Sequence, residues 1–181
     1  KFKMPNNDTV VDYRDMVEDA EGNYWFASFH SGIYYYINAT GQFVTLKDSI
    51  AILLQTSVSS LYADDVHKEV WIGTFGNSLL RYNLITKKLE LFGETEKTKD
   101  YTALMLVTDI GADAKGNIWI ATFSGGIMRY NRGQPFEKAF SKFDMKWGLG
   151  TNNIISVVAD PDSLIWYLSG SGVLAINTNG T

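Results

Sequence analysis

Four tryptophans recur at an almost constant interval and constrain the fold of this chain more than any other feature. Intervals of 46, 48 and 47 residues separate them, and an aspartate stands six residues before each. The four pairs are Asp19–Trp25, Asp65–Trp71, Asp113–Trp119 and Asp160–Trp166. Because chance rarely reproduces one spacing and one period four times, the pattern indicates repeats of about 47 residues.

Each repeat carries the signals of short strands joined by tight turns. Two of the segments between aspartate and tryptophan read Asp-Ala-x-Gly-Asn, and Gly and Asn tolerate the positive φ angles that tight hairpins require. Each tryptophan opens a short apolar run, and in three repeats the residue two positions further on is small. Since alternate residues share one face of a strand, we expect each tryptophan and its small neighbour to pack against an adjoining repeat.

Apolar runs before the aspartate and after the tryptophan bring each repeat to four strands. Such a sheet cannot bury both faces alone, and radial stacking of sheets with this period gives a β-propeller. A parallel β-helix would repeat at roughly half this interval. We therefore predict an all-β chain of four four-stranded antiparallel blades in a partial propeller. We expect one domain over 1–181, with blades at approximately 8–48, 56–93, 104–144 and 152–181, the last without its fourth strand.

Composition and motifs argue against several classes of function. The 181 residues carry 16 basic and 20 acidic side chains, a net charge of −4, which argues against a nucleic-acid partner. The absence of cysteine removes thiolate catalysis and cysteine zinc sites, and no run is long and apolar enough for membrane insertion. The sequence has no nucleophile elbow, zinc-protease motif or phosphate-binding loop, and His30 and His67 stand alone in predicted connections. We predict no catalytic residue, no metal site and no cofactor.

The third repeat, Asp113 to Tyr130, resembles the two-component regulator propeller repeat. It reads Asp-Ala-Lys-Gly-Asn-Ile-Trp-Ile-Ala-Thr-Phe-Ser-Gly-Gly-Ile-Met-Arg-Tyr. The second repeat departs from this motif at Gly76-Asn77-Ser78, and the fourth is one residue shorter. Such repeats form the periplasmic sensor region of hybrid two-component system histidine kinases, which usually carry more than four blades.

The resemblance implies a periplasmic propeller that senses a ligand, often a carbohydrate, and relays the signal by a conformational change. The fragment itself is then not an enzyme, although its parent protein is a histidine kinase. Two alternatives remain open. One is a scaffold for protein–protein interaction. The other is a metal-dependent enzyme of the lactonase or lyase kind, for which Asp15 and Asp109 are the visible carboxylates.

Two groups of residues are candidates for ligand binding. The first is Phe29, Phe75 and Phe123, each four residues after its tryptophan, which we expect on one rim of the propeller. They would either stack on a sugar or close the core between blades. The second group lies in the loops between blades and consists of Tyr101, Trp147, Asn152 and Asn153. Trp147 stands outside the repeat, and an aromatic ring beside amides suits an oligosaccharide, although polar loops often only solvate a turn.

An incomplete ring has consequences for association. The outer faces of its first and last blades lack the neighbour that covers each internal blade. Because exposed apolar sheet surfaces tend to pair with another chain, we expect self-association.

Overall fold

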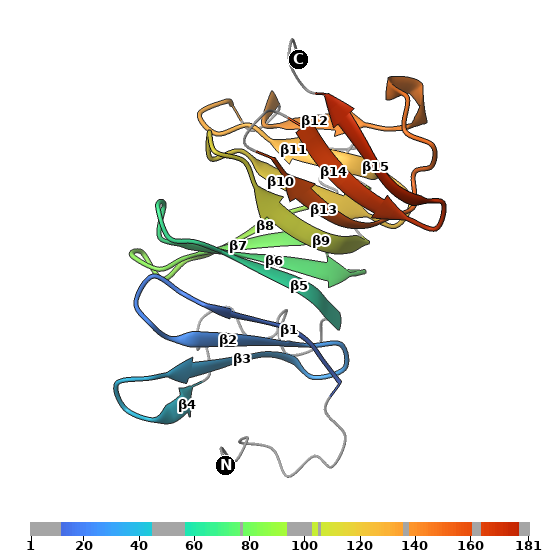
Figure 1. Ribbon diagram of the computed structural model, residues 1–181. Coiled ribbons are helices and arrows are strands. Elements are labelled where there is room, and N and C mark those ends of the chain that lie inside the picture. The colour runs from blue at the N-terminus through green and yellow to red at the C-terminus, as the bar shows by residue number, and fades with distance from the viewer. Residues whose placement is uncertain are drawn as a thin grey trace. The chain divides into compact units, whose positions relative to one another are not determined.

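The computed structural model describes residues 12–44, 57–76, 78–93, 103–104, 106–135, 138–160 and 164–177. This part of the chain contains fifteen β-strands, and its only helical structure is short 3₁₀ turns (Figure 1). The strands form four sheets, each built from strands that are consecutive in sequence. The predicted all-β fold of propeller blades is thus confirmed. The described residues contain no helix with the length and apolar character needed to cross a membrane.

The chain divides into two compact units, Lys1–Leu91 and Phe92–Thr181. The first unit contains two blades, and in each the strands lie side by side in chain order. Blade 1 consists of β1 (Tyr13–Glu18), β2 (Tyr24–Ser28), β3 (Gly32–Ile37) and β4 (Gln42–Val44). Blade 2 consists of β5 (Ser57–Asp64), β6 (Glu69–Phe75), β7 (Leu79–Asn83) and β8 (Leu89–Phe92).

The second unit also contains two blades. Blade 3 consists of β9 (Val107–Ala112), β10 (Ile118–Thr122), β11 (Gly126–Tyr130) and β12 (Phe140–Phe143). Blade 4 consists of β13 (Ile154–Ala159), β14 (Leu164–Ser169) and β15 (Gly172–Asn177). A 3₁₀ turn, η3 (Met145–Trp147), lies between these two blades in the sequence. Among the described residues the fourth sheet has three strands, β13 to β15.

The core of the first unit lies between the two blades. Trp25 and Ala27 of β2 are fully buried. The Trp25 ring lies 4.5 Å from the ring of Tyr35 and 5.2 Å from that of Tyr82 in blade 2, measured between centroids. Blade 2 adds an apolar group to the same cluster: Val58, Leu61, Val70, Ile72, Leu80 and Leu84. The predicted packing of tryptophan and its small neighbour against the next repeat is confirmed here.

The second unit repeats this arrangement. Trp119 and Ala121 of β10 are almost fully buried and belong to one cluster with the facing side chains of blade 4. Those side chains are Ile154, Val157, Ile165 and Tyr167. Because the small residue at the second position lets the adjoining sheet approach the tryptophan, one sequence pattern produces the same interface in both units.

Each blade also contains an irregularity in strand pairing that the sequence does not predict. In all four sheets the pairing of the first two strands shifts register near the start of the first strand. The first residues paired after the shift are Asp15, Ser60, Asp109 and Ser156. Such β-bulges bend a strand and redirect its side chains.

Candidate ligand site

In blades 1 and 3 the recurrent aspartate organises the hairpin between the first two strands. One carboxylate oxygen of Asp19 accepts hydrogen bonds from the backbone N–H groups of Glu21 and Asn23, both at 3.0 Å. The other accepts the indole N–H of Trp25 at 2.7 Å. Asp113 does the same for its own turn and for Trp119, whose indole N–H lies 2.9 Å away. The spacing of six residues thus reflects one carboxylate that holds a turn and a core tryptophan together.

The hydrogen bonds affect the titration of these side chains. Burial raises the pKa of Asp113, but hydrogen bonds from Asn117, Trp119 and Lys115 outweigh it and lower the pKa below its ordinary value. Burial and the nearby carboxylates of Asp19 and Glu21 raise the pKa of Tyr35 well above its ordinary value. Tyr35 therefore stays neutral and accepts a hydrogen bond from the side-chain amide of Asn23 at 2.8 Å.

The second and fourth repeats vary this arrangement. In blade 2 the buried aspartate is Asp64, the last residue of β5 and seven residues before Trp71, whereas Asp65 is exposed in the turn. Asp64 contacts the imidazole of His67 at 2.9 Å. In blade 4, Asp160 donates its backbone N–H to Leu164, and Trp166 is 43% exposed.

Asp15 and Asp109 follow the bulges and bind the adjoining blade of their unit. Asp15 accepts the backbone N–H of Leu61 in β5 at 2.7 Å, and Asp109 accepts that of Val157 in β13 at 2.9 Å. Asp109 also accepts the hydroxyl of Ser156. The two carboxylates considered for a metal-dependent enzyme therefore form hydrogen bonds that hold adjoining blades together. We call such a hydrogen-bonded contact between blades a latch. Among the described residues no cluster of three or more His, Asp or Glu side chains could hold a metal ion.

Two of the three candidate phenylalanines meet in the first unit. Phe29 follows β2, Phe75 ends β6, and their rings lie 5.8 Å apart in an edge-to-face arrangement. The guanidinium of Arg14 lies 5.0 Å from the centre of the Phe29 ring. Both phenylalanines are half-buried, and their contact joins the two blades of this unit. Tyr101 lies outside the described residues.

The remaining candidates gather in the second unit. Phe123, 52% exposed, forms an isolated β-bridge with Asn153. The carbonyl of Asn152 accepts the backbone N–H of Gly126 at 2.9 Å. Its side-chain oxygen accepts the N–H of Met145, the first residue of η3, also at 2.9 Å. The loop before blade 4 is therefore joined both to the β10–β11 connection and to the turn that carries Trp147.

Trp147 is 59% exposed, and a well-defined turn holds it. The side chain of Asp144 caps the start of η3 through the N–H of Lys146, and Gly148 ends the turn in the left-handed conformation. The Trp147 ring packs on Phe143 with centroids 5.5 Å apart, which supports the ring while much of its surface stays in solvent. Four of the candidate residues thus lie in connected loops of this unit, and we refer to them as the Trp147 site: Phe123, Trp147, Asn152 and Asn153.

The sequence does not reveal several contacts that shape these connections. The residue three positions after each tryptophan is Ser28, Thr74, Thr122 or Ser169, and all four are buried. Thr122 donates its hydroxyl to the carbonyl of Gly126 and accepts the N–H of Gly125. An alignment of the four repeats that treats serine and threonine as equivalent would reveal this recurrent hydroxyl residue from the sequence.

The chain matches no family model and no curated protein. Among solved structures it is similar to the extracellular domain of BT3049, a proposed hybrid two component system from B. thetaiotaomicron. That match has a TM-score of 0.74 and 25% identity and covers 94% of this chain and 22% of that one. The extracellular domain of BT4673, proposed to be a hybrid two component system of the same organism, matches with TM-score 0.70 and 20% identity, covering 98% of this chain and 22% of that one.

A catalytically inactive virginiamycin B lyase from Staphylococcus aureus has the same fold at greater distance. Its TM-score is 0.61 at 12% identity, over 98% of this chain and 59% of that one. By comparison, the chain spans about a fifth of the length of the BT3049 and BT4673 extracellular domains. The resemblance indicated by the repeat motif is confirmed by these domains of two-component systems, whereas the lyase shares the fold alone.

Proposed function

We propose that this chain is part of the extracytoplasmic sensor region of a hybrid two-component system, lies in the periplasm, and belongs to a histidine kinase anchored in the inner membrane. The observation that carries the proposal is the similarity to the BT3049 extracellular domain over 94% of the chain. The repeat motif of residues 113–130 supports it independently, because it resembles the propeller repeat of such regulators. In this role the chain binds and signals rather than catalyses.

The ligand that we propose is a carbohydrate, bound at the Trp147 site. Sugar rings present apolar C–H faces, which stack on exposed aromatic rings, and hydroxyls, which pair with amides. Trp147 and Phe123 supply exposed aromatic surface, and Asn153 supplies an exposed amide. The turn that holds Trp147 is capped at both ends, so little conformational entropy is lost when a ligand binds.

The relay that we propose is a change in the packing of adjoining blades. The Trp147 site joins the end of blade 3 to the start of blade 4, and Asp109 latches the same two blades. A ligand that contacts both sides of this joint prefers one arrangement of the blades. The ligand can then shift the equilibrium between two arrangements of the blades, by at most the difference in its binding free energy for them.

The test is a panel of oligosaccharides measured by isothermal titration calorimetry on the 181-residue chain and on Trp147→Ala. We expect one class of glycan to bind the unchanged chain and Trp147→Ala to weaken that binding at least tenfold. Tyr13→Ala, which removes a 40% exposed aromatic ring from the first unit, is the matched control and should bind normally. Equal weakening by both variants, or no binding of any glycan to the chain or to its complete parent region, would rule out the carbohydrate proposal.

The scaffold and enzyme alternatives make different predictions. A scaffold would capture a protein partner and ignore the glycan panel. An enzyme of the lactonase or lyase kind would need calcium or another divalent metal for activity, and Asp109→Asn would abolish that activity. In the present proposal Asp109→Asn changes stability and leaves glycan stoichiometry intact.

A further inference from the structure

The two most exposed large hydrophobic side chains of the described residues lie at one end of blade 2. Val66 is 85% exposed in the turn between β5 and β6, and Ile85 is 72% exposed in the turn between β7 and β8. Figure 1 shows both turns at the same end of the blade, and a backbone hydrogen bond of 2.8 Å from Leu84 to the first turn joins them. We call these two turns, residues 65–68 and 85–88, the blade 2 tip.

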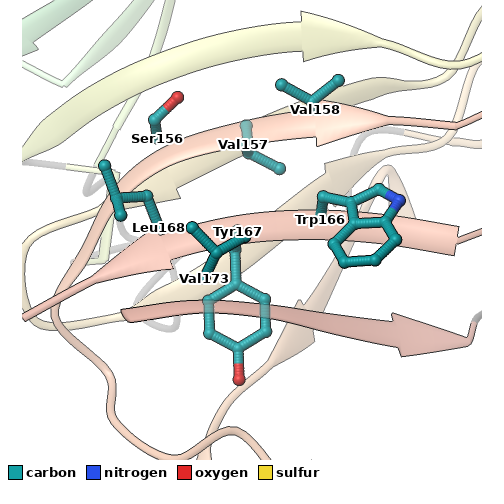
Figure 2. A pocket seen from close by; sticks show the side chains of 7 residues that line it. All are labelled: Ser156, Val157, Val158, Trp166, Tyr167, Leu168 and Val173. Carbon is teal, nitrogen blue, oxygen red and sulfur yellow. The ribbon is translucent and has the colours of Figure 1, made fainter. Parts of the chain in front are cut away.

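The exposed apolar face of blade 4 is of a different kind. Side chains around Trp166 line a pocket on that face (Figure 2). The equivalent faces of blades 1 and 3 are covered by the adjoining blade of their unit, so blade stacking accounts for an apolar face of this type. The blade 2 tip consists of turns and belongs to no sheet face, so its two aliphatic side chains need another explanation.

Basic side chains surround these aliphatic residues. Lys68, Lys87 and Lys88 are all exposed in the tip, and Asp65 is its one acidic residue. With three lysines against one aspartate, the tip has a formal charge of +2, whereas the whole chain carries −4. Lys87 also contacts Glu21 of blade 1 at 3.2 Å. The tip is therefore a basic and aliphatic surface on an otherwise acidic chain.

Two of these lysines have backbone conformations that favour glycine. The φ angle is 56° at Lys68 and 57° at Lys87. The corresponding turn positions of blade 1 are Gly22 and Gly41, with φ of 77° and 68°. Because a Cβ atom disfavours the left-handed conformation, lysine is strained at both positions. Such strain is found where a side chain has a role beyond stability, so it supports a function for the charges of the tip.

The composition of the tip fits a lipid surface better than a protein surface. Protein interfaces are enriched in aromatic residues and arginine and depleted in lysine. The tip contains no Phe, Tyr, Trp or Arg, and three of its eight residues are lysine. A bilayer places hydrocarbon directly beneath a layer of charged headgroups, so aliphatic side chains flanked by lysines match both layers when the headgroups are anionic.

We propose that the blade 2 tip binds the surface of an anionic lipid bilayer. Val66 and Ile85 enter the boundary between headgroups and acyl chains, and Lys68 and Lys88 contact phosphate groups. The same surface repels the acidic remainder of the chain, which favours an orientation with this end of blade 2 toward the membrane. The proposal goes beyond the sensor function and does not depend on the Trp147 site.

The test is co-flotation of the 181-residue chain with vesicles of phosphatidylglycerol and, separately, of phosphatidylcholine, at low and at physiological ionic strength. We expect binding to the anionic vesicles that weakens as salt is added, and at least tenfold weaker binding to the neutral vesicles. Lys88→Glu and Ile85→Ser should each weaken binding at least fivefold. Both side chains are exposed, so neither change disturbs the core.

Each variant has a matched control in the second unit. Lys115→Glu changes the net charge by the same amount as Lys88→Glu, at an exposed position in the β9–β10 turn of blade 3. Met145→Ser, like Ile85→Ser, removes an exposed apolar side chain, which here is 59% exposed. Both controls should bind the anionic vesicles normally.

Absence of binding to phosphatidylglycerol vesicles at low ionic strength would overturn the proposal, as would equal binding to the neutral vesicles. Equal weakening by Lys88→Glu and Lys115→Glu would show that net charge, rather than the tip, determines binding. Weakening by Lys88→Glu with normal binding by Ile85→Ser would indicate a purely electrostatic contact. An acidic protein surface would supply such a contact equally well, so that result would also reject the bilayer as the partner.

Discussion

At the scale of single residues, the most informative side chain is the repeat aspartate, because it couples a turn to the core. Asp113 accepts two backbone N–H groups and the indole N–H of Trp119. Removal of such an acceptor leaves several donors without their partner, which costs about 1–3 kcal/mol. The same residue therefore links the sequence motif, the local structure and the stability of the second unit.

We predict that Asp113→Asn lowers the free energy of unfolding at pH 7 by about 1–3 kcal/mol, since an amide cannot replace both carboxylate acceptors. The pKa of Asp113 is lowered in the folded state, so the carboxylate contributes stability above its ordinary value of 3.8. That contribution disappears as the pH falls through the lowered folded pKa. Urea unfolding between pH 2.5 and 7 should therefore show the variant and the unchanged chain converging in acid.

Asp65→Asn is the matched control for this experiment. Asp65 also lies six residues before a tryptophan, but it is exposed, whereas Asp64 ends β5. We expect no measurable change at either pH. A loss of stability equal to that of Asp113→Asn would show that the spacing in sequence, rather than the hydrogen bonds, identifies the important aspartate.

A second prediction concerns Gly126, which has a φ of +82°. A Cβ atom at this position would lie 2.2 Å from the carbonyl oxygen of Phe143. Gly133 has a similar φ of +78°, but nothing lies within 4 Å of its Cβ position. Gly133→Ala should therefore cost only the backbone strain, about 1–2 kcal/mol, and Gly126→Ala clearly more. Thermal unfolding measures both, and equal costs would refute the steric argument.

At the scale of elements, the bulge in the first strand decides how adjoining blades are held. Asp109 follows the bulge of β9 and binds two groups of β13, and Asp15 reaches Leu61 from β1 in the same way. The sequence shows these two aspartates at equivalent positions, but it does not show the bulge. From the sequence alone, the metal-dependent alternative is therefore as compatible with these two aspartates as a contact between blades is.

We predict that Asp109→Ala loosens β13 without unfolding the chain. The N–H of Val157 and the hydroxyl of Ser156 lose their acceptor, which costs about 2–4 kcal/mol if both stay unpaired. Hydrogen exchange should become faster at Val157 and its neighbours in β13. Asp15→Ala is the matched control, because it should accelerate exchange at Leu61 and leave Val157 unchanged. Identical exchange maps for the two variants would argue against local latches.

At the scale of the whole molecule, the sequence predicts the blades well and the contacts of the candidate ligand site only in part. The same contacts recur within each blade and between adjoining blades, so the tryptophans and turn residues that make them recur at a regular spacing in the sequence. The Trp147 site depends instead on irregular loops. Nothing in the residue pattern indicates that the side chain of Asn152 binds the N–H of Met145, or that Phe123 bridges to Asn153.

The last prediction follows from how this site joins two blades. If a glycan binds at Trp147, it should restrict the loop before blade 4. Exchange of the N–H groups of Gly126 and Met145 should then slow, because each is bonded to Asn152 and exchanges only when that loop opens. The N–H of Phe29, bonded to Asp12 in the first unit, is the internal control and should not change. Hydrogen exchange with and without the ligand distinguishes a local joint from general stabilisation: equal slowing at all three groups would exclude a signal that begins between blades 3 and 4.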